Sequence, residues 1–259
     1  MYYPGSKERI AGAILFYVLK NRDDRPYVEP FMGGANVICN VSGERYGNDI
    51  NPYLISMWKA LQEGWTPPEF VDKETYKHMM RNQGLYDPHL VGYTGFVCSF
   101  NSNWFKGHRG IVERVRTGKD GKPVLENQQE WARNNLMRQV SSMIGVHLSH
   151  SSYEELPIPK NSIVLCDPPY AEVTKDYITR QFDTISFWEW VRDMKSSAMI
   201  FVTEYVAPDD FTCVWEENIN PVGGTLHGSR QPNKLFVHES QLHMVDTTPP
   251  SLPKLRIPS

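Results

Sequence analysis

A continuous apolar run, residues 162–166 (SIVLC), leads directly into Asp167-Pro168-Pro169-Tyr170. An uninterrupted apolar run of this length is typical of a parallel strand that is buried on both faces. Ligands of open α/β sheets bind beyond the carboxyl ends of such strands. The sequence therefore predicts that these four residues face a site, and the alternative is a plain surface turn after a strand.

An acid, two prolines and an aromatic residue suit the activation of an exocyclic amino group. Such a nitrogen is conjugated with its ring, and acceptors on its N–H groups would free its lone pair for attack. Asp167 supplies a carboxylate oxygen, and Pro168 supplies a carbonyl whose direction the proline rings restrict. Tyr170 offers a face on which a flipped base can stack, worth roughly 1–3 kcal/mol. We therefore interpret Asp167, Pro168, Pro169 and Tyr170 as candidate catalytic residues.

Apolar periodicity around this motif predicts alternating strands and helices. Strands are expected at residues 27–31, 45–47, 162–166, 198–202 and 235–237, and helices within 7–19, 54–61 and 187–194. This alternation is typical of a Rossmann-like α/β core with a mixed, mostly parallel sheet.

The alternation fades between residues 68 and 150, where only Leu136, Val140 and Ile144 indicate a helix. We predict a discontinuous catalytic domain at residues 1–67 and 151–245 that is interrupted by an insertion at 68–150. Residues 246–259 form a proline-rich tail.

Two further motifs follow the first two expected strands. The first, Glu29-Pro30-Phe31-Met32-Gly33-Gly34, places glycines where backbone can approach a ligand closely. The second, Asn48-Asp49, places a carboxylate where nucleotide-binding α/β folds hold ribose hydroxyls. Each has a structural alternative: the glycines could form a tight turn, and Asp49 or Asn51 could cap a helix.

Taken together, these motifs resemble the Dam-like DNA adenine N6-methyltransferases of the alpha group, which include phage members. The matching segments are Tyr3-Pro4-Gly5-Ser6-Lys7, Glu29 to Gly34, Asn48-Asp49-Ile50 and Asp167 to Tyr170, in the family's order. The resemblance implies S-adenosylmethionine as cofactor and double-stranded DNA as substrate, with methyl transfer to N6 of a flipped-out adenine. It implies cofactor contacts from Tyr3, Lys7, Glu29, Phe31, Gly33, Gly34, Asp49, Tyr153 and Asp167.

The insertion carries the candidate DNA contacts. Residues 106–122 hold six basic and two acidic side chains, a net charge of +4, and contain an Asp-Gly turn signal. We expect a basic hairpin here, with phosphate or base contacts from Lys106, Arg109, Arg114 and Arg116. Phe100, Asn101 and Trp104 loosely resemble the family's aromatic-Asn-Gly segment that enters DNA. The alternatives are a solvated loop for the basic run and a small core of the insertion for the aromatic residues.

Composition excludes several other classes. The chain has 259 residues and a net charge of −3, which fits a globular protein whose DNA contacts are local. Its four cysteines form no C-x-x-C pair and its histidines have no ligand spacing, so we expect no metal site. No apolar stretch near the start is long enough for a signal or a membrane span, which predicts a soluble cytoplasmic protein.

Two kinds of competing function remain open at this point. One is methylation of another planar amino group, either cytosine N4 in DNA or adenine in RNA. Asp167 favours adenine, because the cytosine N4 enzymes often carry serine there. The other is a catalytically silent DNA-binding relative, against which the intact Lys7, Asp167 and Tyr170 argue.

Overall fold

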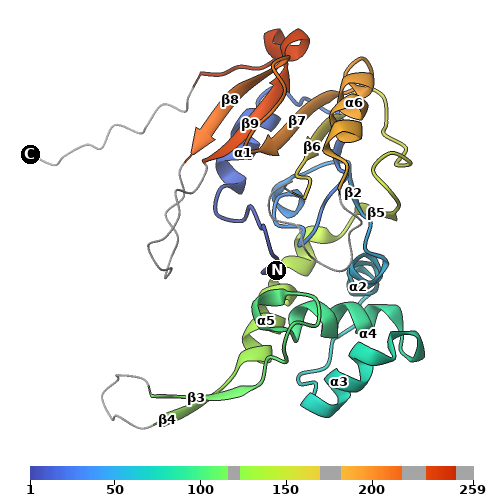
Figure 1. Ribbon diagram of the computed structural model, residues 1–259, viewed down its shortest axis with the longest axis vertical. Helices are drawn as coiled ribbons and strands as arrows, with labels where there is room; N and C mark the ends of the chain where they lie inside the picture. The colour runs from blue at the N-terminus through green and yellow to red at the C-terminus, as the bar shows by residue number, and fades with distance from the viewer. Residues whose placement is uncertain (116–122, 170–181, 218–231, 249–259) are drawn as a thin grey trace, which may run out of the picture. The chain divides into compact units, whose positions relative to one another are not determined.

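The computed structural model describes residues 1–115, 123–169, 182–217 and 232–248 (Figure 1). The chain divides into two compact units. Unit 1 comprises Met1–Arg9 and Pro26–Ile158, and unit 2 comprises Ile10–Arg25 and Pro159–Ser259. The boundaries that we predicted at residues 68 and 150 fall inside unit 1, and the division into catalytic domain and insertion stays a prediction.

Three parallel strands form the sheet of unit 1. They are β1 (Tyr27–Glu29), β2 (Arg45–Asp49) and β5 (Val146–His150), in the order β5-β2-β1. Asn48 ties their carboxyl ends together, since its Nδ2 donates to the Pro30 carbonyl at 3.1 Å and to the Ser151 carbonyl at 3.0 Å. The residues that follow β1, β2 and β5 therefore meet at one edge of the sheet.

Helix α2 (Pro52–Gln62) follows β2 and packs its apolar face inward. Leu54, Met57 and Leu61 are buried at the spacing that the sequence predicts. The helix begins at Asn51, whose Oδ1 accepts from the backbone amides of Tyr53 and Leu54. Asn51 is therefore the N-cap, which leaves the Asp49 carboxylate for other contacts.

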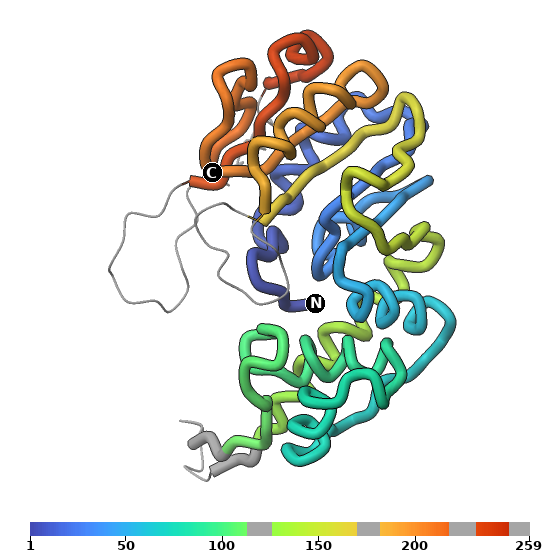
Figure 2. Tube along the Cα trace, turned by 45° about the vertical axis from the view of Figure 1, so that its right-hand side comes forward, coloured from blue at the N-terminus to red at the C-terminus, as the bar shows by residue number. Residues whose placement is uncertain are grey.

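The segment that we predicted to be an insertion contains short helices, one long helix and one strand pair. In chain order these are α3 (Lys73–Arg81), α4 (Pro88–Gly92), a π turn η3 (Tyr93–Val97), β3 (Ile111–Val115), β4 (Pro123–Asn127) and α5 (Gln128–Met143). Figure 2 traces the turns between α2 and β3, coloured cyan to green, as a stack of short coils. The described residues of unit 1 also form short 3-10 turns, η1 (Ile38–Asn40), η2 (Gln83–Leu85) and η4 (Phe100–Ser102).

Unit 2 contributes four strands in the order β6-β7-β9-β8. The parallel pair is β6 (Ile163–Cys166) and β7 (Met199–Glu204), and β9 (Asn233–His238) runs antiparallel to both β7 and β8 (Phe211–Glu217). The helical elements in its described residues are α1 (Ala11–Leu19), α6 (Thr184–Met194) and the 3-10 turn η5 (Glu239–Met244). Across the described residues the seven strands follow the order β5-β2-β1-β6-β7-β9-β8, which confirms an α/β fold with a mixed, mostly parallel sheet.

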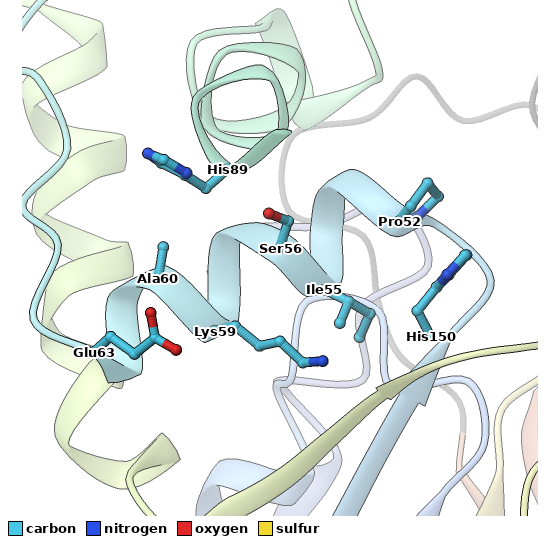
Figure 3. A pocket seen from close by; sticks show the side chains of 8 residues that line it. All are labelled: Pro52, Ile55, Ser56, Lys59, Ala60, Glu63, His89 and His150. Atoms are coloured by element: carbon cyan, nitrogen blue, oxygen red, sulfur yellow. The ribbon is translucent and has the colours of Figure 1, made fainter. Parts of the chain in front are cut away.

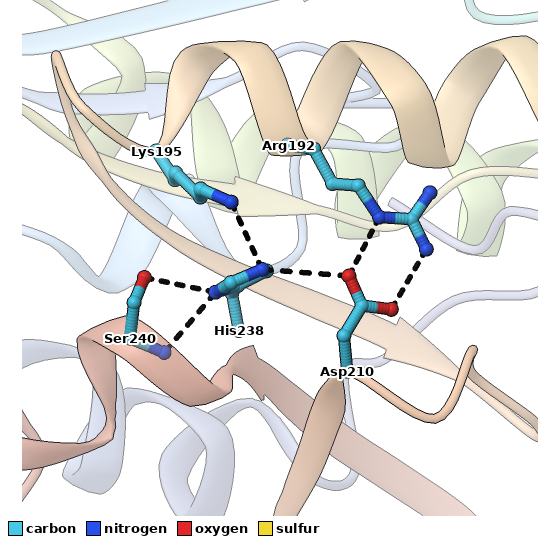
Figure 4. Close-up of polar contacts among 5 residues, drawn as sticks. All are labelled: Arg192, Lys195, Asp210, His238 and Ser240. Atoms are coloured by element: carbon cyan, nitrogen blue, oxygen red, sulfur yellow. Dashed lines mark hydrogen bonds and ion pairs between the residues drawn. The ribbon is translucent and has the colours of Figure 1, made fainter.

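A polar cluster joins α6, β8 and β9 within unit 2 (Figure 4). Arg192 donates to both carboxylate oxygens of Asp210, at 2.6 and 2.7 Å, and this contact lowers the pKa of Asp210 to about 2. His238 Nε2 lies 3.4 Å from the Asp210 carboxylate and 3.0 Å from Lys195 Nζ. Its Nδ1 accepts from the Ser240 amide at 3.1 Å. The cluster therefore fixes the helix against the antiparallel strands.

Two strands of the large sheet, β5 and β8, are not among those expected from the sequence. β5 was assigned to the insertion, but it pairs with β2, with Val146 opposite Arg45. Its sequence, VHLSH, lacks a continuous apolar run because it is an edge strand. β8 was missed for a similar reason, since most of its residues are at least partly exposed. The helix predicted near Leu136 is present as α5, but it ends before Ile144, which is exposed.

No helix in the described part of the chain combines the length and apolar character that crossing a bilayer requires. Among the same residues, no three His, Cys, Asp or Glu side chains cluster so that they could hold a metal ion. Cys98 and Cys166 are buried free thiols, and Cys213 is exposed.

Candidate functional site

The segment after β1, residues 31–35, forms a glycine loop that is held by Asp49 at the end of β2. The Asp49 carboxylate accepts from the Gly33 amide at 3.0 Å through Oδ2 and from the Asn51 amide at 2.9 Å through Oδ1. Burial raises the pKa of Asp49, although these two amide hydrogen bonds oppose the shift. Each carboxylate oxygen has a second lone pair, which can accept one more hydrogen bond.

The two glycines of this loop make room for Tyr3. A Cβ added at Gly33 would come within 2.9 Å of the Tyr3 ring, and one added at Gly34 within 2.6 Å of the Tyr3 Cβ. Gly33 also has a positive φ of 49°, which favours glycine. The close approach of Tyr3 therefore requires glycine at both positions, and the predicted contacts of Gly33, Gly34 and Tyr3 with the cofactor stay predictions. Burial, with the nearby Asp49 charge, raises the pKa of Tyr3.

Residues 1–7, the N-terminal segment, are fixed by Asn36. Its Nδ2 donates to the Met1 carbonyl and to Ser6 Oγ, both at 2.8 Å. Lys7 at the end of this segment is buried, and its Nζ donates to the Gly5 carbonyl at 3.1 Å. Asn36 thus brings Tyr3 and Lys7 to the same loop as Asp49, which sequence reasoning did not foresee because Asn36 belongs to none of the motifs.

The remaining candidate cofactor residues of unit 1 lie after β1 and β5. The rings of Phe31 and Tyr153 lie 5.3 Å apart at an angle of 38°, as an aromatic pair. Glu29, the last residue of β1, is buried and its Oε1 accepts from Tyr27 Oη at 2.7 Å. Unit 1 therefore brings together a carboxylate, an aromatic pair and a lysine from four separate segments of the chain.

In unit 2, Asp167 follows β6 and is held by a side chain of β7. Thr203 Oγ1 donates to Asp167 Oδ1 at 2.6 Å and lies 3.3 Å from the Cys166 carbonyl. Thr203 is 1% exposed, whereas Asp167 is half-buried. Sequence reasoning missed Thr203, although a polar residue directly after the apolar run of β7 was the available signal.

Pro168 is buried and Pro169 is half-buried. Tyr170, the fourth candidate catalytic residue, lies outside the described residues. The structure therefore describes the acid and both prolines of the motif, with one oxygen of the acid oriented by Thr203.

Residues 99–109, which we name the recognition segment after the DNA contacts predicted for them, have an exposed and a buried part. Phe100 is 57% exposed, and Asn101 and Lys106 are also exposed. Asn101 has a positive φ of 51°, in a turn closed by the hydrogen bond from the Phe100 amide to the Gly107 carbonyl at 2.7 Å. Sparsely populated backbone of this kind persists where the surrounding structure fixes it, and it occurs often at functional sites.

Trp104 is half-buried, and its ring packs against other side chains. Its ring lies 4.7 Å from that of Phe96 and 5.5 Å from that of Tyr53, and a Cβ at Gly95 would collide with it at 2.3 Å. This arrangement favours the alternative reading, in which the residue packs in the core of the insertion.

Arg109 is also inside the molecule, with 7% exposure. Its backbone amide donates to the Cys98 carbonyl at 2.7 Å, and burial lowers the pKa of its guanidinium group. A duplex phosphate cannot reach a side chain so covered, so we remove Arg109 from the predicted phosphate contacts. The sequence misled here because the basic residues around position 109 suggested a solvated run.

The strand pair that follows is the expected hairpin in its described part. β3 and β4 are antiparallel, with Arg114 opposite Val124 in the register. In Figure 1 the two strands lead away from the helices of the insertion. Arg116, Lys119 and Lys122, with the Asp-Gly turn signal, lie outside the described residues.

A separate groove of about 340 Å³ runs along the outer face of α2 (Figure 3). His89 from α4 and His150 at the end of β5 border it, together with Ser56, Lys59 and Glu63 of α2. None of the candidate cofactor or DNA residues lines this groove, so we assign it no role in the reaction.

Comparison with known proteins is informative for the first third of the chain. Residues 3–91 match the D12 class N6 adenine-specific DNA methyltransferases. The matched stretch contains the N-terminal segment, the glycine loop and Asp49, and it ends before the recognition segment and Asp167. No curated protein matches the chain.

Two solved structures are similar to the chain at 12% sequence identity. The rRNA methyltransferase aviRa from Streptomyces viridochromogenes has a TM-score of 0.41, with 94% of this chain and 89% of that chain covered. SMU.472 complexed with SAH has a TM-score of 0.35, with 90% of this chain and 52% of that chain covered. Both similarities are weak over the whole length.

Proposed function

We propose that this protein is a DNA adenine N6-methyltransferase that takes its methyl group from S-adenosylmethionine. The observation that carries the proposal is the match of residues 3–91 to the D12 class, because that stretch includes Tyr3, Lys7, the glycine loop and Asp49. The Asp-Pro-Pro-Tyr motif after β6 adds the residues that adenine activation needs.

Unit 1 offers a fitting set of groups for the cofactor. The Asp49 carboxylate would accept the ribose hydroxyls, and the Phe31–Tyr153 pair would lie beside the adenine ring. Lys7 would pair with the methionine carboxylate. The bound cofactor supplies an electrophilic methyl group on a sulfonium, so the protein has to position the reactants rather than move a proton first.

Asp167 would activate the amino group that receives the methyl. Thr203 donates to Oδ1 and so orients the carboxylate, which would accept from an adenine N6–H. The Pro168 carbonyl would accept from the second N–H, and Tyr170 would stack on the flipped base. These acceptors act on charge that develops at N6 during transfer, so their effect belongs to the rate rather than to substrate binding.

The recognition segment and the hairpin would contact the duplex. Phe100 and Asn101 are exposed at a turn with restricted backbone, which suits insertion beside a flipped base. Lys106, Arg114 and Arg116 would contact phosphates or base edges. Trp104, whose ring packs against Phe96, would have an indirect role.

The test is expression in cells that lack adenine methylation, followed by genome-wide mapping of N6-methyladenine. We expect methylated adenines in one sequence context with the parent protein and none with Asp167→Ala. Methylation of cytosine N4 or of RNA alone would assign the activity to another class of amino-methyltransferase. Tight DNA binding with no methylated base would instead indicate a silent relative.

A further inference from the structure

A side chain of the long helix α5 contacts the glycine loop directly. Gln139 Nε2 donates to the Ala35 carbonyl at 2.7 Å and to the Gly34 carbonyl at 3.1 Å. Its Oε1 accepts from the amino group of Met1. Both amide protons of Gln139 are thus used by the loop that would hold the cofactor.

The loop has a backbone conformation that needs such support. Ala35 is fully buried and has a positive φ of 56°, which a residue with a Cβ rarely adopts. Asp49 accepts a hydrogen bond from the Gly33 amide of the loop, and Gln139 donates one to the Ala35 carbonyl. A shift of α5 would therefore release one of the two anchors.

The same helix is attached to the recognition segment at its other end. Gln129, which is completely buried, donates through Nε2 to the Arg109 carbonyl at 2.6 Å and to the Val71 carbonyl at 2.8 Å. Its Oε1 accepts from the Val71 amide at 2.9 Å. Helix α5 also begins directly after β4, with Asn127 as N-cap. Ten residues, or about 15 Å of helix, separate this anchor from Gln139.

We propose that Gln139 is a positioning residue through which α5 couples duplex binding to the conformation of the glycine loop, and so to cofactor affinity. The inference rests on the proposed function. A helix moves nearly as a rigid body, so a displacement imposed on Gln129 and the hairpin reaches Gln139. Because such coupling is reciprocal, bound cofactor should strengthen duplex binding by the same factor.

The experiment measures the affinity of S-adenosylhomocysteine by calorimetry, with and without a mixed-sequence duplex that contains many adenines. The parent protein is expected to bind S-adenosylhomocysteine at least about fivefold more tightly when the duplex is present, within the range typical of coupled sites. Gln139→Ala should reduce this factor to less than about twofold and raise the KM for S-adenosylmethionine with kcat little changed.

Two further variants separate the hydrogen bond from the shape of the side chain. Gln139→Glu keeps the shape but replaces the donor with an acceptor, so it should lose the coupling as Gln139→Ala does. Gln139→Lys keeps a donor and should retain most of the coupling between duplex and cofactor binding. Ser141→Ala, exposed on the same helix, is the matched control and should behave as the parent. Thermal unfolding of each variant shows that the comparison is among folded proteins.

The inference is overturned if Gln139→Ala and Gln139→Glu keep the parent's coupling factor, or if folded Gln139→Lys loses it. It is also overturned if the duplex does not change affinity in the parent while labelled methyl groups still reach DNA, a result that leaves the proposed function intact. Failure of the parent to transfer methyl groups to any DNA would instead reject the proposed function, and this inference with it.

Discussion

The candidate acids at the ends of the parallel strands are all at least partly buried, whereas the candidate residues of the recognition segment range from buried to exposed. After β1, β2 and β6, the acids named by the motifs are buried or half-buried, and each has a defined donor. Asp49 accepts from the Gly33 amide and Asp167 from the Thr203 hydroxyl. In the recognition segment, neighbouring candidates separate, with Phe100 exposed and Arg109 buried.

The difference shows that a motif and a local excess of charge predict different things. A motif that directly follows a buried strand is positioned by that strand, so the sheet determines where its acid lies. A run of basic residues specifies only composition, and packing decides which of them reach solvent. Predictions for the first region should therefore concern activity, and those for the second should separate stability from DNA binding.

The largest effect is expected at the end of β6. Asp167→Ala should lower the methylation rate by at least about 100-fold, because it removes the acceptor that activates N6. Thr203→Val should lower it less, since the carboxylate remains but loses its orienting donor. Transfer of labelled methyl groups to DNA measures both rates, and circular dichroism checks the fold. A rate for Asp167→Ala above a few per cent of the parent would reject the mechanism.

Alanine variants of Trp104 and Phe100 compare a packed with an exposed aromatic residue within the recognition segment. Trp104→Ala should lower the free energy of unfolding by about 3 kcal/mol, since the ring packs against Phe96 and Gly95. Phe100→Ala removes an exposed ring, so stability should change by less than about 0.5 kcal/mol. Urea denaturation measures both variants.

The same two variants should differ in DNA binding in the reverse order to their effects on stability. Phe100→Ala should weaken binding to a duplex, and Trp104→Ala should do so only to the extent that the protein unfolds. Equal losses of stability in the two variants would mean that Phe100 is also part of the core.

Smaller effects are expected from a matched pair of variants at Arg109 and Lys106. Arg109→Ala should lower the free energy of unfolding by about 1–3 kcal/mol through lost packing, with the slope of DNA affinity against salt unchanged. Lys106→Ala should leave stability unchanged and reduce that slope by about one unit, as the loss of one phosphate contact does. The reverse pattern would show that the Arg109 guanidinium reaches DNA in the complex.

These regions also show how far the sequence alone predicts the molecule. The strands that carry motifs were found because continuous apolar runs, glycines and acids are local signals. The edge strand β5 and the orienting Thr203 were missed, because a partly exposed strand and a single hydroxyl acquire their roles only through neighbours distant in sequence. The contacts of Gln139 and Asn36 depend in the same way on the packing of α5 and the N-terminal segment.

The smallest effect expected is the pH dependence of cofactor binding, and it tests whether the carboxylate of Asp49 receives the ligand. Burial disfavours the charged form and raises the pKa of Asp49 in the ligand-free protein. Ribose hydroxyls would donate to the charged form, so affinity for S-adenosylmethionine should fall as the pH falls through this raised pKa. The decrease should therefore begin above the ordinary aspartate range of about 4 and amount to about tenfold, the difference between a charged and a neutral acceptor.

The same shift has the opposite sign for the stability of the ligand-free protein. As the pH rises through the ordinary aspartate range, the unfolded chain loses its proton before the folded protein does, so Asp49 then lowers the free energy of unfolding. Calorimetric titration between pH 5 and 8 measures the affinity of the parent and of Asp49→Asn, which cannot titrate at this position. The variant should bind more weakly and with a flat profile. If instead it keeps the parent's pH dependence, another group governs binding and Asp49 only anchors the glycine loop through Gly33.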